Sequence, residues 1–165
     1  MKKLIRTAAA LAAMAVLGTP GTVLAADGNH KVTKEMAKQE AEKLVPEDGA
    51  LQYTEKHEDT YEVLYYSASQ EEYYTVRVCA DTGKVESLAT ALLNSQGSKE
   101  AVLSEEEIKQ IVMEDAGEVT VDSIALDTED GRKQYDVFCS RDNFQALYRV
   151  HPESGKILER VIVYL

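Results

Sequence analysis

The residue types that most often carry chemistry are few in this sequence and show no recognisable spacing. The three histidines, His30, His57 and His151, are far apart, and none belongs to a His-Glu-x-x-His motif or to another zinc-binding spacing. The chain also lacks a glycine-rich phosphate loop and a Gly-x-Ser-x-Gly nucleophile elbow. The sequence therefore predicts a protein that is not an enzyme, with no catalytic residues, no metal ligands and no cofactor.

The charge of the chain excludes one class of partner. Its 165 residues include 18 basic and 29 acidic side chains, for a net charge of −11, and 44% of the residues are hydrophobic. A nucleic-acid-binding protein needs a basic face, so we expect no nucleic-acid partner. The acidic run 105–107 could suggest a calcium or peptide site, but charges in the first turn of a capped helix are the preferred interpretation.

The first 25 residues have the order of a secretory signal peptide. A short basic start is followed by the apolar run 8–17, the helix breakers Gly18 and Pro20, and small residues before a predicted cleavage between Ala25 and Ala26. The apolar run has about half the length needed to span a bilayer. We expect an extracytoplasmic protein, secreted or held in the cell envelope, with no stable membrane span after cleavage. Its remaining charge is −14, because 15 basic residues then face 29 acidic ones.

Three landmarks occur twice in the rest of the chain, in the same order and at nearly constant separations of 71, 74 and 72 residues. They are a helix-capping residue, a Tyr-acid-Val segment and an acid-x-Gly-Lys turn. They lie at Thr33 and Ser104, at 61–63 and 135–137, and at 81–85 and 153–157. At the second helix start, Ser104 and Glu107 predict a capping box. In both turns, glycine supplies a positive φ.

After each helical pattern the period of the apolar residues changes from 3.6 to 2, which indicates strands. We expect them near 51–56, 60–67, 73–79, 119–127, 134–140 and 144–151, with a tail strand at 156–164. The predicted fold class is α+β, with two repeats of one helix packed on a three- to four-stranded antiparallel β-meander. A unit of about 60 residues buries little core alone, so we expect the two units to pack together or to share a sheet.

These landmarks resemble the PepSY family, whose pattern combines a capped amphipathic helix, a Tyr-acid-Val strand and a closing turn that runs from Asp through Gly-Lys to Val. The second copy departs from the pattern, with Glu153 before the turn and Ile157 after it. The resemblance divides the chain into a signal peptide at 1–25, a first PepSY-like repeat at 31–90, a linker at 91–101 and a second repeat at 102–165. It implies an exported, non-catalytic bacterial module that inhibits or restrains peptidases.

The two cysteines, Cys79 and Cys139, could form a disulfide in an exported chain. Strand alternation, however, places Cys139 on the core face with Tyr135 and Val137, and places Cys79 on the other face. We therefore expect buried or free thiols in preference to a bridge.

The sheet face opposite the helices should carry large apolar side chains. These weak candidates for partner binding are Leu64, Tyr66, Tyr73, Phe138 and Leu147. The preferred interpretation is that the two units cover these faces with each other, and the alternative is an exposed strip for a partner. That partner would be a secreted peptidase or another envelope protein. A second functional hypothesis is an acidic cell-envelope component that binds wall polymers or cations.

Overall fold

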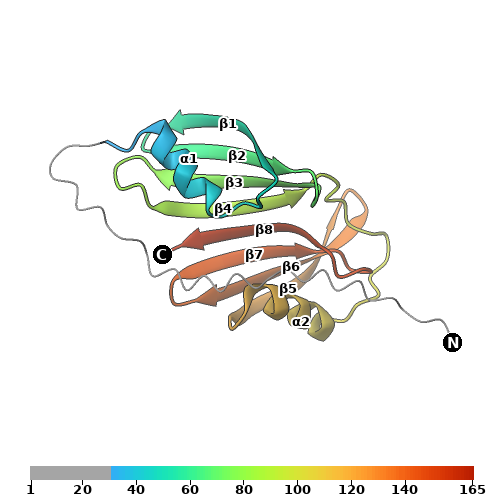
Figure 1. Cartoon of the computed structure of the whole chain (residues 1–165). Coiled ribbons are helices and arrows are strands. Elements are labelled where there is room, and N and C mark those ends of the chain that lie inside the picture. Colours follow the sequence, from blue (N-terminus) through green and yellow to red (C-terminus); the bar gives the residue numbers. More distant parts are fainter. Residues whose placement is uncertain (1–30) are drawn as a thin grey trace. The chain divides into compact units, whose positions relative to one another are not determined.

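The computed structural model describes residues 31–165, which form one compact unit (Figure 1). The predicted signal peptide, its cleavage between Ala25 and Ala26, and His30 lie outside the described residues. The described chain is α+β, and an eight-stranded antiparallel sheet carries two helices. In chain order the elements are α1 (Lys34–Glu42), β1 (Gly49–His57), β2 (Thr60–Ser67), β3 (Glu72–Cys79), β4 (Val85–Leu92), α2 (Glu105–Ala116), β5 (Thr120–Glu129), β6 (Arg132–Arg141), β7 (Phe144–Val150) and β8 (Ile157–Tyr164).

Both helices begin where the sequence predicts, and each has its own cap. The hydroxyl of Thr33 accepts a hydrogen bond from the Met36 N–H at 3.3 Å. At α2 the capping box is complete, because the Glu107 N–H donates to the Ser104 hydroxyl while the Glu107 carboxylate accepts from the Ser104 N–H at 2.8 Å. These bonds satisfy backbone groups that a helix start leaves without partners.

The strands form one sheet in the order β1-β2-β3-β4-β8-β7-β6-β5. Strand β4 pairs with β8, so the N-terminal half (31–92) and the C-terminal half (102–165) meet at the middle of the sheet, and β1 and β5 are its edges (Figure 1). The strand at Val85–Leu92 was not among the predicted strands, and it is the one through which the halves join.

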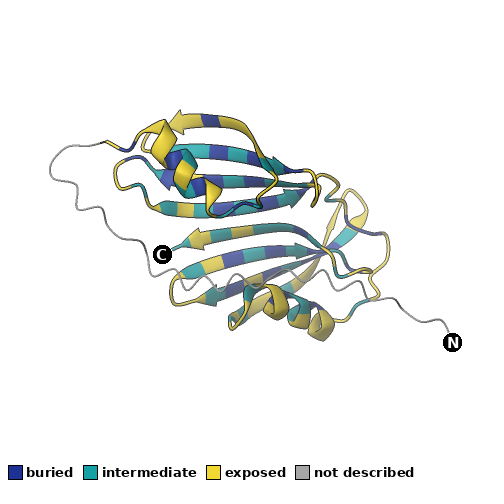
Figure 2. Cartoon of the chain, in the orientation of Figure 1, coloured by how far each residue is buried: buried dark blue, intermediate teal, exposed yellow. Residues whose placement is uncertain are grey.

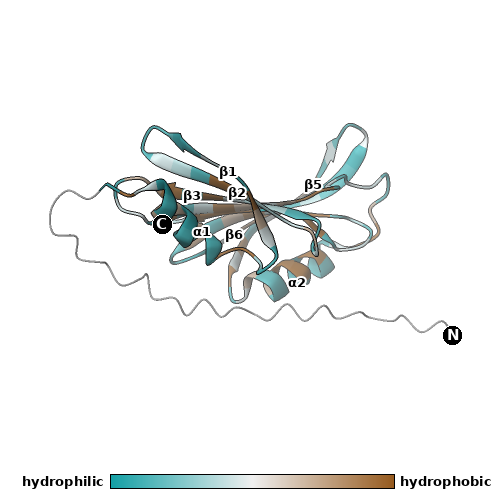
Figure 3. Ribbon diagram, turned by 45° about the horizontal axis from the view of Figure 1, so that its top comes forward, coloured by the Kyte–Doolittle hydropathy of each residue, from teal (hydrophilic) through white to brown (hydrophobic). Residues whose placement is uncertain are grey.

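Two hydrophobic cores lie on the same face of this sheet. One is built around α1 and includes Leu88, and the other is built around α2 and has Ile162 at its border. Leu88 and Ile162 are directly opposite each other in the β4–β8 ladder, and paired residues share a face. Both helices therefore cover one face of the sheet, as Figure 3 shows from the side.

The other face of the sheet corrects one expectation. We expected the two units to cover their apolar faces with each other, but the halves pair edge to edge and not face to face. Among the described residues no helix or second sheet lies over this face, and Phe138 keeps 49% of its surface exposed. Because only one face of the sheet is covered, buried residues alternate with more exposed ones along β2, β3, β6 and β7 (Figure 2). We call this uncovered side the open face.

The segment between the two halves is held against the sheet. Ser98 forms a short antiparallel bridge with Lys133, in which the Ser98 N–H donates to the Lys133 carbonyl at 2.9 Å. The guanidinium of Arg132 also donates to the Gly97 carbonyl at 3.2 Å. The predicted linker is thus fixed at the start of β6.

Candidate functional site: the open face

Side chains on the open face form rows across the strands, because residues opposite each other in a ladder point to the same side. One row is mainly apolar and crosses six strands, from β2 to β6. Its members in order are Leu64, Thr75, Ala89, Val161, Leu147 and Phe138. Three of the five residues singled out in the sequence therefore lie in one row, which we call the apolar row.

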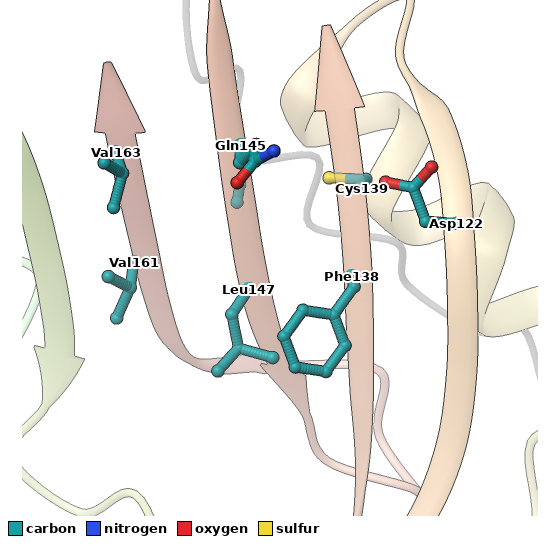
Figure 4. Close-up of a pocket in the computed structure, with 8 residues that line it drawn as sticks. Asp122, Phe138, Cys139, Gln145, Leu147, Val161 and Val163 are labelled. Carbon is teal, nitrogen blue, oxygen red and sulfur yellow. The ribbon is translucent and has the colours of Figure 1, made fainter. Parts of the chain in front are cut away.

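The C-terminal end of the apolar row lines an open hollow of about 350 Å³. Figure 4 shows Leu147 between Phe138 and Val161, with Val163 and Gln145 beside them and Asp122 at the far side. Val161 and Val163 are exposed to 37% and 46% of their surface. An exposed set of large apolar side chains is uncommon on a protein that has no partner, so this region is a candidate docking surface.

The next row on the open face begins with an aromatic pair. Tyr66 and Tyr73 are opposite each other on β2 and β3, and their ring centroids are 4.9 Å apart with the planes tilted by 45°. Tilted rings at this distance attract each other beyond simple burial. The other two predicted residues therefore stand together at the N-terminal end of the face.

The same row becomes charged in the C-terminal half, where it contains Glu159, Arg149 and Asp136. The Arg149 guanidinium is 2.9 Å from the Glu159 carboxylate and 3.5 Å from that of Asp136. Burial raises the pKa of the Asp136 carboxyl, the nearby Arg149 opposes this, and the negative charges of Asp127 and Glu159 add to it. Asp136 is thus held among like charges, next to the apolar row.

The structure gives each residue of the two Tyr-acid-Val segments a role. The hydroxyls of Tyr61 and Tyr135 donate to the carbonyls of Val32 and Leu103, which directly precede the helix caps, at 3.1 and 3.0 Å. The valines, Val63 and Val137, are fully buried in the two cores. Tyrosine and valine therefore build the helix-covered side.

The acids of these segments point to the open face, and each pairs with the arginine opposite it. The Glu62–Arg77 distance is 3.1 Å and the Asp136–Arg149 distance is 3.5 Å. Hydrogen bonds from Tyr53 and Arg77 lower the pKa of Glu62, although burial opposes them. The motif therefore stabilises the sheet and also supplies charge to the open face.

The histidines and cysteines of the described residues lie away from the open hollow or point to the core. The Nδ1 atom of His151 accepts from the N–H groups of Glu153 and Ser154 in the turn before β8, and His57 lies 3.5 Å from the Glu55 carboxylate. Cys79 and Cys139 are both free thiols. Cys139 lies in the second core as expected, and burial raises the pKa of its thiol to about 11, so it is a poor nucleophile.

Sequence reasoning missed several residues of the open face. Val161 and Val163 belong to β8, whose residues are apolar at both alternating positions, so periodicity alone could not assign them to a face. Ala89 belongs to β4, the strand that was not predicted. What the face offers is apolar area, aromatic rings and carboxylates, which suit the binding of a protein.

Two other kinds of site are absent from residues 31–165. Within that range, His, Cys, Asp and Glu side chains do not gather in threes in a way that could hold a metal ion. Neither α1 nor α2 is long and apolar enough to cross a membrane.

Comparison with known proteins identifies a domain in the C-terminal half. The family model described as "Peptidase propeptide and YPEB domain", abbreviated PepSY, matches residues 102–161, so a PepSY domain is found there. No curated protein matches the chain.

Two solved structures are similar to the chain at 15% identity. One is a candidate lipoprotein from Clostridium difficile 630, with a TM-score of 0.35, where the match covers 84% of this chain and 97% of the other. The second is a BLIP-like protein from Bacteroides fragilis NCTC 9343, with a TM-score of 0.33 and coverage of 79% and 86%.

Proposed function

We propose that this protein is an exported, non-catalytic module of the PepSY type that binds a secreted peptidase and restrains or modulates it. The PepSY domain at residues 102–161 carries the proposal, since that family is described by its occurrence with peptidases as a propeptide. The signal-peptide pattern at 1–25 supports export, and the protein would then act in the cell envelope or outside the cell.

The N-terminal half is, in this proposal, a second PepSY-like unit. The same hydrogen bonds recur in both halves: the Val32 N–H donates to the Ala80 carbonyl and the Leu103 N–H to the Pro152 carbonyl. The turn glycines behave alike as well, with φ of 71° at Gly83 and 72° at Gly155. These correspondences support a tandem of units at 31–90 and 102–165, joined by the linker 91–101.

The open face is the proposed binding surface. Its candidate contacts are Leu64, Tyr66, Tyr73, Phe138 and Leu147, together with Val161 and Val163. A restraining module needs no reacting groups, and it needs an apolar centre that a partner can cover. The helix-covered face cannot serve in this way, because α1 and α2 already occupy it.

The test is inhibition of a panel of secreted metallopeptidases by the purified protein. The wild-type protein should inhibit at least one enzyme, and Phe138→Ser should weaken that inhibition by about tenfold or more, as loss of a central aromatic anchor does. Val102→Ser is the matched control, because Val102 is 68% exposed and precedes α2. Circular dichroism checks that both variants are folded.

Two results would overturn the proposal. No inhibition across the panel, combined with salt-sensitive binding of wall polymers or Ca²⁺, would favour an acidic envelope component instead. Inhibition that Phe138→Ser and the pair Tyr66→Ala and Tyr73→Ala leave unchanged would show that the open face is not the surface used.

A further inference from the structure

The two ends of the open face differ in charge balance. In the N-terminal half the guanidinium of Arg77 pairs with Glu62, and a second carboxylate, that of Glu55, lies opposite Glu62 with the His57 imidazole 3.5 Å from it. In the C-terminal half the single guanidinium of Arg149 lies between two carboxylates, at 2.9 Å from Glu159 and 3.5 Å from Asp136. The C-terminal end therefore carries unbalanced negative charge.

Two further carboxylates add to this surplus. Asp127 on β5 is close enough to Asp136 to raise the pKa of that carboxyl. On the other side of the hollow, Asp122 is exposed and lines the hollow itself (Figure 4). Neither residue has an ion-pair partner among the described residues. The hollow is thus apolar at its centre, with excess carboxylates on two sides.

The spacing of these features defines the shape of an occupant. Asp136 and Phe138 are two residues apart on β6, as are Arg149 and Leu147 on β7, so the charged and apolar rows are about 7 Å apart along the strands. On an extended chain, side chains two residues apart point to the same side at the same distance. An extended segment lying along β6 and β7 can therefore contact both rows.

We infer that the open face of the C-terminal half binds an extended, basic protein segment. An apolar side chain of that segment enters the hollow and packs on Leu147, flanked by Phe138 and Val161, and a Lys or Arg two positions away pairs with Asp136, Glu159 and Asp127. This inference rests on the proposed function, which requires a protein partner, and it specifies the chemistry of the partner's contact surface. A second copy of this chain fits poorly, because its own open face would bring the same carboxylates against each other.

The test uses three peptides and ¹⁵N-labelled protein followed by NMR. The basic probe is acetyl-Ser-Lys-Ser-Leu-Ser-Lys-Ser-amide, with lysines two positions on either side of leucine. One control peptide has Glu in place of both Lys, and the other has Ser in place of Leu. We expect the basic probe to shift the amides of β6, β7 and β8, the serine peptide to bind about tenfold more weakly, and the acidic peptide to cause no shifts.

Variants that remove carboxylates test the charged part of the surface separately from the apolar hollow. The double variant Asp122→Asn and Asp127→Asn should weaken binding of the basic probe by about five- to tenfold, and it should reduce the salt dependence of that binding. Glu106→Gln is the matched control, because Glu106 is exposed on α2, and binding should change less than twofold. Equal binding of the acidic and basic peptides would overturn the inference. So would shifts confined to other elements, or unchanged binding by the double variant.

The experiment also keeps this inference distinct from the proposed function. Inhibition of a peptidase that is lost in Phe138→Ser but retained in the double asparagine variant would overturn the inference and leave the function standing. Binding of the basic probe at the hollow by a protein that inhibits no peptidase would support the inference and contradict the function.

Discussion

The N-terminal and C-terminal halves place the same backbone bonds at their helix starts and turns, but they fill the space beneath the helices differently. The residues that face the sheet from α1 are Ala37 and Ala41, whereas those from α2 are Ile108 and Val112. All four are fully buried. The same arrangement of elements therefore tolerates small or large side chains, and α2 contributes more apolar burial than α1.

The open faces of the two halves differ in the same way. The N-terminal half presents the stacked rings of Tyr66 and Tyr73, whereas the C-terminal half presents the hollow beside Phe138 and an excess of carboxylates. The groups that differ between the halves are the ones that a partner would contact. The bonds that the halves share are those that hold each helix on the sheet.

The largest expected effect on stability comes from the buried helix residues that face the sheet. Ile108→Ala should lower the free energy of unfolding by about 2–5 kcal/mol, because it leaves a cavity under α2. The reverse exchange in the other half, Ala37→Ile, should cost about 1–3 kcal/mol by overpacking. Urea unfolding followed by circular dichroism measures both. A cost below about 1 kcal/mol for Ile108→Ala would contradict the conclusion that α2 contributes more apolar burial than α1.

Substitution of the turn glycines, Gly83 and Gly155, should have the next largest effect on stability, and the two costs should differ. An alanine at either position has a strained positive φ, which costs about 1 kcal/mol. A Cβ at Gly155 would also lie 2.5 Å from the Ile111 side chain, whereas at Gly83 the nearest contact is 3.5 Å, from Val32. We expect Gly155→Ala to cost about 2–4 kcal/mol and Gly83→Ala about 1 kcal/mol in the same assay. Equal costs would show that α2 shifts freely to make room.

The two tyrosine hydroxyls test the features that the halves share. Tyr61→Phe and Tyr135→Phe each remove one hydrogen bond to the carbonyl before a helix cap, at 3.1 and 3.0 Å. Each should cost about 1 kcal/mol, with a difference between them below about 0.5 kcal/mol. A cost confined to one variant would mean that the corresponding bonds do not have corresponding roles.

The smallest expected effect is a pH dependence that only one helix cap has. Hydrogen bonds from the Ser104 N–H and hydroxyl lower the pKa of Glu107 below its ordinary value of 4.5, and the residue at the same place in the first cap is Met36. A carboxyl whose pKa is lowered in the folded state stabilises the protein at a pH above its ordinary pKa. This contribution is lost as the pH falls through the lowered pKa.

Urea midpoints between about pH 3 and pH 6 should therefore depend less on pH in Glu107→Gln than in the wild type. Glu106→Gln is the control and should keep the dependence of the wild type. An unchanged profile for Glu107→Gln would contradict the role of this carboxylate.

Local features were predictable where neighbouring residues determine them. The caps at Thr33 and Ser104, the turn glycines and the core position of Cys139 all follow from short-range patterns, and the structure confirms each of them. Strand β4 was missed because alanine, serine and threonine fill much of it. Small residues give weak alternation, and their strand preference depends on what packs against them.

The position of five residues on the open face was predictable from the sequence, but the form of that face was not. Alternation placed Leu64, Tyr66, Tyr73, Phe138 and Leu147 opposite the helices, and the ladders place them in two adjacent rows. Alternation could not tell whether another layer covers them. The apolar row also depends on Ala89 and Val161, which join the two halves through a pairing that links residues more than 70 positions apart.

The sequence by itself determined most of the elements of this protein. Periodicity set the helices and most strands, and capping and turn residues set where they begin and end, because these effects act over a few residues. Only the tertiary structure decided that β4 and β8 pair, so that two halves share one sheet and leave one face of it open. Edge-to-edge and face-to-face arrangements bury the same helix-facing residues, so the pattern of apolar residues is identical for both. Long-range strand pairing distinguishes them, and it determines which surface remains available to a partner.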